Sequence, residues 1–112
     1  MPHTLRGYQN RYLRGLAHGL KPLVLIGQKG ITDSVTDSIS RALADHELIK
    51  IKFLDLDDRG QKKTMLGEIA ERCHCAVAGV TGNTAILIRP HEDPEKRQIK
   101  LPERPEHQDG VQ

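Results

Sequence analysis

Residues 23–34 read Leu23-Val24-Leu25-Ile26-Gly27-Gln28-Lys29-Gly30-Ile31-Thr32-Asp33-Ser34 and predict a strand, a tight turn and the start of a helix. The apolar residues before Gly27 suit a strand that is buried on both faces. The two glycines of the turn let the backbone bend sharply and let another molecule approach closely. Thr32 is a good N-cap, and the first amides of a helix attract phosphate, to which Lys29 adds a positive charge. This G-x-x-G turn is a candidate phosphate contact, although many such turns need glycine for geometry alone.

The flanking sequence predicts a small mixed sheet with helices packed on it. Apolar spacing predicts helices over 5–20, 33–46 and 62–73, and strands over 48–56, 76–81 and 84–89. Gly82-Asn83 suits a tight hairpin turn between the last two strands. Strand-helix-strand units pair in parallel through right-handed crossovers, whereas a hairpin is antiparallel. We therefore expect an α/β (α+β-like) fold, with an N-terminal helix followed by β-α-β-α-β-β in a four-stranded sheet.

The length of 112 residues suits one domain with a single core, which we expect to span residues 1–90. Residues 91–112 are rich in Pro, Glu, Gln, Lys and Asp, so this tail is expected to be mostly disordered, apart from an extended piece at 98–101. No apolar run reaches the length of a membrane span, and the N-terminus lacks the apolar stretch of a secretory signal. We therefore expect a cytoplasmic protein.

Charge is distributed unevenly along the chain. Residues 1–32 contain no acid but carry Arg6, Arg11, Arg14, Lys21 and Lys29. Acids dominate residues 33–58, and a second basic cluster follows at Arg59, Lys62 and Lys63. The net charge of +2 therefore allows one strongly basic face, which an anionic polymer would meet.

Metal and enzyme chemistry have little support. Structural zinc usually takes four ligands from two spaced pairs, and the chain has one pair, in Cys73-His74-Cys75. Cys73 suits a packed helix end, and the run from Asp55 to Asp58 suits a strand-end turn better than a magnesium cluster. The Gly27–Gly30 turn matches neither the dinucleotide-binding nor the P-loop pattern. We expect no enzymatic activity, metal or cofactor.

Several separated motifs occur in a set order. They are Leu13-Arg14-Gly15-Leu16-Ala17-His18 with Leu20-Lys21-Pro22, then Ile26-Gly27-x-x-Gly30-Ile31-Thr32, His46-Glu47-Leu48-Ile49-Lys50-Ile51-Lys52, and Gly82-Asn83-Thr84-Ala85-Ile86-Leu87-Ile88-Arg89-Pro90. Over residues 5–90 they resemble the CRM domain (chloroplast RNA splicing and ribosome maturation), the family of the bacterial YhbY protein. The chain departs from that pattern at Gln28, where a basic residue is common, and at Ile88, where an aromatic is common. The resemblance implies a fold similar to the C-terminal domain of bacterial translation initiation factor three.

The resemblance and the charge pattern agree on structured RNA as the partner. The family implies ribosome biogenesis, with precursor rRNA of the large ribosomal subunit in a pre-ribosomal particle. With two tyrosines, one phenylalanine and no tryptophan, the chain has few side chains to stack on bases, so we expect contacts to phosphates. We expect a monomer that needs no membrane. The predicted RNA-binding residues are Gly27, Gln28, Lys29, Gly30, Arg11, Arg14, Lys21, Lys62 and Lys63.

Three other interpretations stay open at this point. An Alba-like protein that coats nucleic acid has a similar fold and would prefer DNA to RNA. A protein that binds a small ligand or nucleotide would grip a phosphate on the same loop. A protein-binding module would instead use the acidic helix predicted over 33–46.

Overall fold

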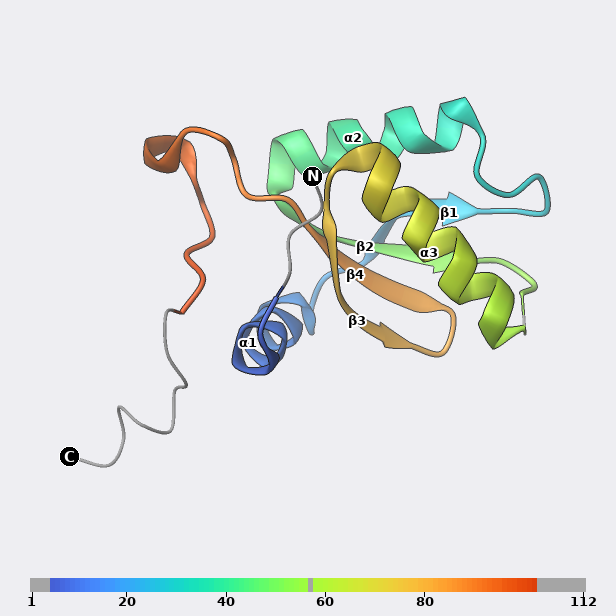
Figure 1. Ribbon diagram of the computed structural model, residues 1–112, viewed down its shortest axis with the longest axis horizontal. Helices are drawn as coiled ribbons and strands as arrows, with labels where there is room; N and C mark the ends of the chain where they lie inside the picture. The colour runs from blue at the N-terminus through green and yellow to red at the C-terminus, as the bar shows by residue number, and fades with distance from the viewer. Residues whose placement is uncertain (1–4, 57, 103–112) are drawn as a thin grey trace.

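The computed structural model describes residues 5–56 and 58–102. Figure 1 shows a sheet with helices on both sides, and the residues outside these two ranges are drawn as a thin grey trace. The elements are α1 (Gly7–Ala17), β1 (Pro22–Ile26), α2 (Asp33–His46), β2 (Leu48–Phe53), α3 (Arg59–Cys73), β3 (Ala76–Thr81), β4 (Thr84–Ile88) and the short 3-10 helix η1 (Pro94–Lys96).

The four strands form one mixed sheet in the order β1-β2-β4-β3. β1 and β2 are parallel, with α2 as their crossover, and β4 is antiparallel to both β2 and β3. This arrangement confirms the predicted fold. Because β1 and β2 run the same way and β4 runs back, the turn after β1, the connection after β2 and the β3–β4 turn share one end of the sheet, here called the loop end. The amides of Phe53 and Leu54 tie these segments together by donating to the carbonyls of Asn83 and Ile26, both at 2.8 Å.

One face of the sheet packs against α2 and α3. Along β2, Ile49, Ile51 and Phe53 alternate toward this face and are almost fully buried, as the alternating sequence predicts. Burying apolar surface is the main stabilising contribution in such a layer. The helices contribute Ile39, Leu43, Leu66, Ile69 and Cys73 to the same cluster.

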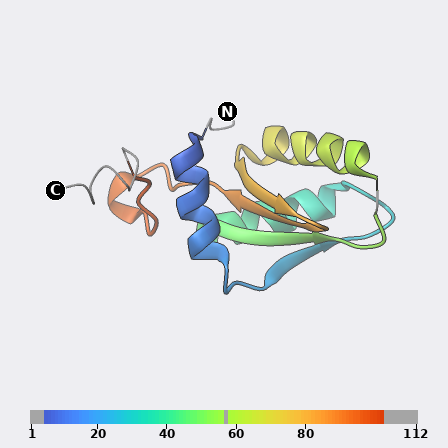
Figure 2. The ribbon, with the colours of Figure 1, turned by 90° about the horizontal axis from the view of Figure 1, so that it is seen from below.

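A smaller apolar cluster covers part of the opposite face. Leu13 and Ala17 of α1 are fully buried there against Ile86 and Ile88 of β4. Figure 2 shows α1 crossing the end of the sheet that lies away from the loop end. The rest of this face, near β1 and the loop end, is therefore left without a covering helix.

The prediction that β1 is buried on both faces is wrong. Val24 and Ile26 point into the main core, but Leu23 and Leu25 are 53% and 56% exposed. β1 lies at the edge of the sheet, and α1 packs against β3 and β2 instead. A short apolar run cannot reveal this, because it looks the same whether one or both faces are covered.

Three helix boundaries also differ from the predictions. α1 spans Gly7–Ala17 rather than residues 5–20, so both of its ends differ. α3 begins at Arg59 rather than Lys62, because Asp58 caps it: the Asp58 carboxylate accepts the N–H of Gln61 at 3.1 Å. Asp58 is thus a helix N-cap, whereas the sequence predicts a strand-end turn over Asp55–Asp58.

Glu47 attaches the segment after β4 to the domain. Its side chain is buried, and its carboxylate accepts the backbone N–H groups of His91 (2.6 Å), Gln98 (2.5 Å) and Ile99 (2.9 Å). Composition predicts a mostly disordered tail, whereas residues 91–102 contact the domain through these hydrogen bonds. The composition of the segment cannot predict these contacts, because they depend on the buried Glu47 carboxylate of the domain. Residues 103–112 lie outside the described part of the chain.

Arg89 joins the two helices of the main layer. Its guanidinium donates to the Ser40 hydroxyl (3.0 Å), the Ser40 carbonyl (2.7 Å) and the Cys73 carbonyl (2.8 Å). Hydrogen bonds from a charged donor are among the stronger ones in proteins. The arginine that closes the last motif is therefore a structural residue of this fold.

Both cysteines, Cys73 and Cys75, are free and buried, and the Cys73 carbonyl accepts one of the Arg89 hydrogen bonds. Burial raises the pKa of Cys73, and it raises the pKa of Cys75 to about 12. Each thiol lies near a backbone carbonyl, with Cys73 Sγ 3.6 Å from the Thr36 oxygen. The Cys73 thiol packs in the core at the end of α3, as the sequence predicts.

The raised pKa of Cys75 predicts a loss of stability in alkali. The folded state keeps this thiol protonated, so its contribution is complete below the ordinary value of 9.0 and decreases as pH rises toward about 12. We expect the free energy of unfolding of the wild type, relative to Cys75→Ala, to fall by on the order of 1 kcal/mol for each pH unit above that ordinary value. Urea unfolding at pH 7 to 11 measures it, and a constant difference between the two proteins would contradict it.

Candidate functional site

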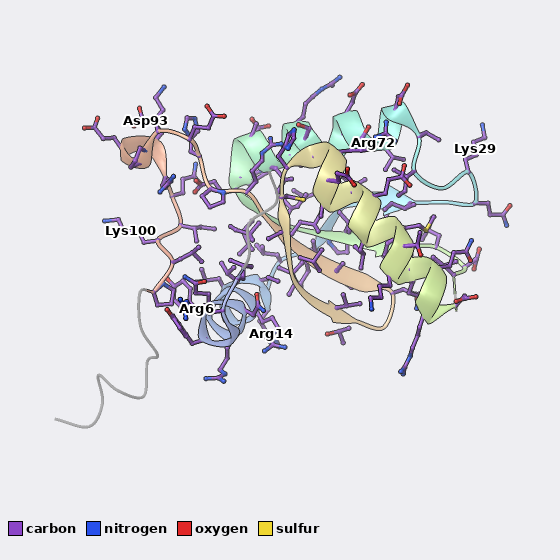
Figure 3. The ribbon with its side chains drawn as sticks, in the orientation of Figure 1. Arg6, Arg14, Lys29, Arg72, Asp93 and Lys100 are labelled. Carbon is purple, nitrogen blue, oxygen red and sulfur yellow. The ribbon has the colours of Figure 1, made fainter. Side chains whose placement is uncertain are left out.

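The Gly27–Gly30 turn lies at the tip of the loop end. The N–H of Gly30 donates to the Gly27 carbonyl at 3.1 Å, which closes a four-residue turn. The middle residues Gln28 and Lys29 are exposed. Figure 3 shows the Lys29 side chain pointing outward from the extreme end of the molecule. The turn therefore presents a cation at a position that an extended partner can reach.

The two glycines of the turn have different roles. Gly30 has φ +74°, and a Cβ there would lie 3.3 Å from Met65 Cε on α3. Gly30 is therefore needed by the fold. Gly27 lies in open space, where a Cβ would meet no atom within 4 Å. Packing within the protein therefore does not require glycine at position 27. The absence of a side chain there leaves the backbone open to a partner.

The start of α2 is capped by the protein itself. The Thr32 hydroxyl accepts the N–H of Val35 at 3.2 Å, as the sequence predicts. The exposed Asp33 carboxylate receives a hydrogen bond of 2.7 Å from Arg72 of α3, which in turn raises the pKa of Arg72. Arg72 offsets the charge of Asp33, and the cap is a neutral hydroxyl. The helix end contributes less to anion binding than free amides would, and Lys29 becomes correspondingly more important.

The predicted basic residues fall into two groups. Lys62 and Lys63 lie in the first turns of α3 at the loop end, and Lys62 Nζ donates to the Gly82 carbonyl at 3.4 Å. Arg11 and Arg14 are exposed on α1, which crosses the other side of the sheet at its other end, and Lys21 is exposed just before β1. The fold therefore does not gather the nine predicted residues into one cluster.

Two lysines that were absent from the prediction lie between these groups. Lys50 and Lys52 of β2 point to the face that carries α1, because their neighbours Ile49, Ile51 and Phe53 point into the main core. Lys50 Nζ donates to the His18 carbonyl at the end of α1 (3.4 Å). Lys52 is exposed and pairs across the sheet with Leu25 and Thr84, near the loop end.

The stem of Arg14 lies over this same face. A Cβ built on Gly79 of β3 would come within 2.8 Å of Arg14 Cδ, so the arginine crosses the strand at the point where a side chain is missing. The guanidinium remains exposed, as expected for a long side chain that buries its stem. Arg14, Lys50 and Lys52, together with exposed Leu23 and Leu25, form what we call the open face.

No acidic residue occurs in α1 or in any of the four strands. The acids of the described residues lie on α2, on α3, in the connections and in residues 92–95. A surface with one sign of charge attracts a polyanion over a longer range than single pairs do. The open face and the turn thus make a cationic path from α1 to the loop end.

The sequence contained a signal for the lysines of β2. The alternation of Lys50 and Lys52 with buried residues predicts that both lysines lie on the same face of the strand, but it also fits an ordinary solvated face. Only the sheet order and the position of α1 show that this face is open and adjoins Arg14.

Within the described residues, no group of three or more His, Cys, Asp or Glu side chains is placed to hold a metal ion. The described helices include none that is long and apolar enough to cross a membrane.

Comparison with known proteins gives consistent matches over the same region. The family model of the CRS1 / YhbY (CRM) domain matches residues 5–89. A Haemophilus influenzae protein named RNA-binding protein is 37% identical over 99 residues, which are 88% of this chain and 96% of the relative. The Bacillus subtilis protein YqeI is 33% identical over 98 residues, 88% of this chain and 99% of the relative. The solution structure of the hypothetical protein SAV1595 from Staphylococcus aureus superposes with a TM-score of 0.75 at 31% identity, covering 88% of this chain and all of that one.

Substitution by alanine should affect stability differently at the two glycines of the turn. Gly30→Ala forces a left-handed conformation on alanine and a contact with Met65, so we expect a loss of about 1–2 kcal/mol in the free energy of unfolding. Gly27→Ala meets no atom, and we expect a change within about 0.5 kcal/mol. Urea unfolding of both variants measures the difference, and equal losses would show that the turn geometry is not as described.

Proposed function

Because the chain belongs to the CRS1 / YhbY (CRM) domain family, we propose that it binds structured RNA through the Gly27–Gly30 turn and the open face. The observation that carries this proposal is the cationic path itself. Lys29 stands at one end, Lys52 and Lys50 follow along β2, and Arg14 stands at the other end, on a surface whose helix and strands contain no acid. The name of the Haemophilus influenzae relative, RNA-binding protein, supports the same conclusion.

The chemistry of this surface favours contacts to the RNA backbone. Lysine and arginine bind phosphates and fix the position of a protein without reading sequence directly. Neither tyrosine of α1 lies on a strand, and the one aromatic residue on the sheet, Phe53, is buried in the main core. Stacking of bases on aromatic rings, as in other sheet-based RNA-binding domains, therefore has no platform here. Recognition should depend on the shape of a folded RNA and on the spacing of its phosphates.

The proposal extends to the identity of the RNA. Resemblance to the CRM domain implies ribosomal RNA of an assembling large subunit. We further propose that the chain acts there as a monomeric, non-enzymatic factor in the cytoplasm. Ribosomal RNA offers rigid helices and junctions with closely spaced phosphates, which suit a path of cations laid out on a rigid sheet.

The cationic path predicts a steep salt dependence. If about five phosphates are neutralised, log affinity falls with log salt at a slope of roughly −4 to −5, taking the duplex coefficient. Lys50→Gln/Lys52→Gln removes two of these contacts, so the slope should become shallower by about 2. Fluorescence anisotropy with a structured RNA at several salt concentrations measures both values.

The matched control for this variant is Lys96→Gln/Lys100→Gln. It removes the same charge from exposed lysines of the segment after β4. Figure 3 shows Lys100 of this segment well apart from Arg14 and Lys29. We expect its slope to equal that of the wild type. Equal changes in both double variants would mean that net charge alone, rather than the open face, determines the affinity.

The ribosomal part of the proposal predicts where the protein sediments. In a gradient of extract from cells that express the chain, we expect enrichment with precursors of the large subunit and loss of that enrichment after RNase treatment. Lys29→Ala removes the cation at the tip of the turn and should shift the protein toward the top of the gradient. Wild-type protein found only at the top would contradict the ribosomal assignment and leave binding to other structured RNA to be tested by the anisotropy experiment.

A further inference from the structure

A groove lies outside the path described above, between α3 and the β3–β4 hairpin. Its volume is about 740 Å³, within the range of ligand sites in proteins. The floor is apolar, and the rim is basic. The lining residues that carry the argument are Leu66, Val77, Val80, Arg59, Lys62 and Lys63.

The floor of this groove exposes apolar surface on an edge strand. Val80 is 50% exposed although it points to the same face as Ala85, its buried partner on β4. β3 is an edge strand, so no further strand covers it. The groove is therefore an apolar surface that the fold of the described residues leaves open.

Gly67 forms part of the groove wall and has no role in the packing of the protein. It lies in the interior of α3, where glycine is less favourable than alanine. A Cβ at this position would meet no atom within 4 Å, and no positive φ requires glycine there. The missing side chain instead keeps the wall of the groove open toward an occupant.

The charge of the rim selects an anionic occupant. Arg59, Lys62 and Lys63 line the groove, and no acidic residue does. On the neighbouring flank of the same helix, Met65 lies beside the Gly27–Gly30 turn, since a Cβ built on Gly30 would be 3.3 Å from Met65 Cε. The groove and the turn therefore lie on either side of the first turns of α3, close enough to belong to one RNA footprint.

We infer that the groove receives a single unpaired nucleotide of the RNA, with its base on the apolar floor and its phosphate beside Arg59 and Lys63. This inference rests on the proposed function, because it adds a base-binding pocket to the phosphate contacts of the open face. Burial against an apolar floor is non-directional, so the pocket recognises an unpaired base without strong preference for its identity. The protein would then prefer RNA helices that carry a bulge.

The experiment uses three RNA hairpins: one with a single bulged adenosine, one fully paired, and one with an abasic residue at the bulge. We expect the full-length protein to bind the bulged hairpin roughly tenfold more tightly than the other two, the factor that corresponds to burying on the order of 60 Å² of apolar surface of the base. Gly67→Leu fills the groove with a residue that favours helix, so the preference should vanish while affinity for the paired hairpin stays the same. Thr64→Leu adds the same side chain to α3 outside the groove lining and should keep the preference.

The outcomes separate this inference from the proposed function. Equal affinity for the three hairpins would overturn the groove assignment and leave RNA binding standing, whereas no binding to any hairpin would contradict the function itself. Retention of the preference by Gly67→Leu, with urea unfolding showing an intact fold, would also overturn it. So would binding of a glutamate-rich peptide that Gly67→Leu blocks, since the occupant would then be an acidic protein.

Discussion

The alternation of side chains along β2 is the constraint on which both the fold and the proposed binding surface depend. In a strand, neighbouring residues point to opposite faces. The orientation of β2 that buries Ile49, Ile51 and Phe53 under α2 and α3 therefore also directs Lys50 and Lys52 to the other face. A shift of register by one residue would bury both lysines, which is costly for unpaired charges, and would expose the core. The central strand thus sets the hydrophobic layer and the cationic face together.

The consequence is a division of charge between the two sides of the sheet. The α2 and α3 side carries acids, some of them paired, as in the contacts of Arg72 with Asp33 and Glu68. α1 and β2 carry cations and no acid, and the other three strands carry no charged residue. A net charge of +2 describes the average and conceals this arrangement. For a polyanion, the local field of one face matters more than the total, so a nearly neutral chain can still bind RNA strongly on one side.

The sequence predicted the sheet topology because each element carried a local signal, such as the Thr32 cap, the Gly82-Asn83 turn and the alternation of β2. It did not predict which face of β1 is covered, because coverage depends on where α1 lies after Ala17, a long-range choice that a short apolar run does not record. For the candidate site, the sequence identified the turn at Gly27–Gly30 and its lysine. It missed Lys50 and Lys52 for the same reason that it misjudged β1: only the assembled sheet shows that their face is open.

The most direct test of this account follows the backbone amide resonances of the labelled protein while a structured RNA is added. The account predicts that the largest changes in chemical shift occur in the Gly27–Gly30 turn, at Lys50 and Lys52, and around Arg14, with the outer surface of α2 unchanged. Changes confined to α2, with the turn and the open face unaffected, would contradict the central claim that the sheet presents RNA with a continuous cationic path.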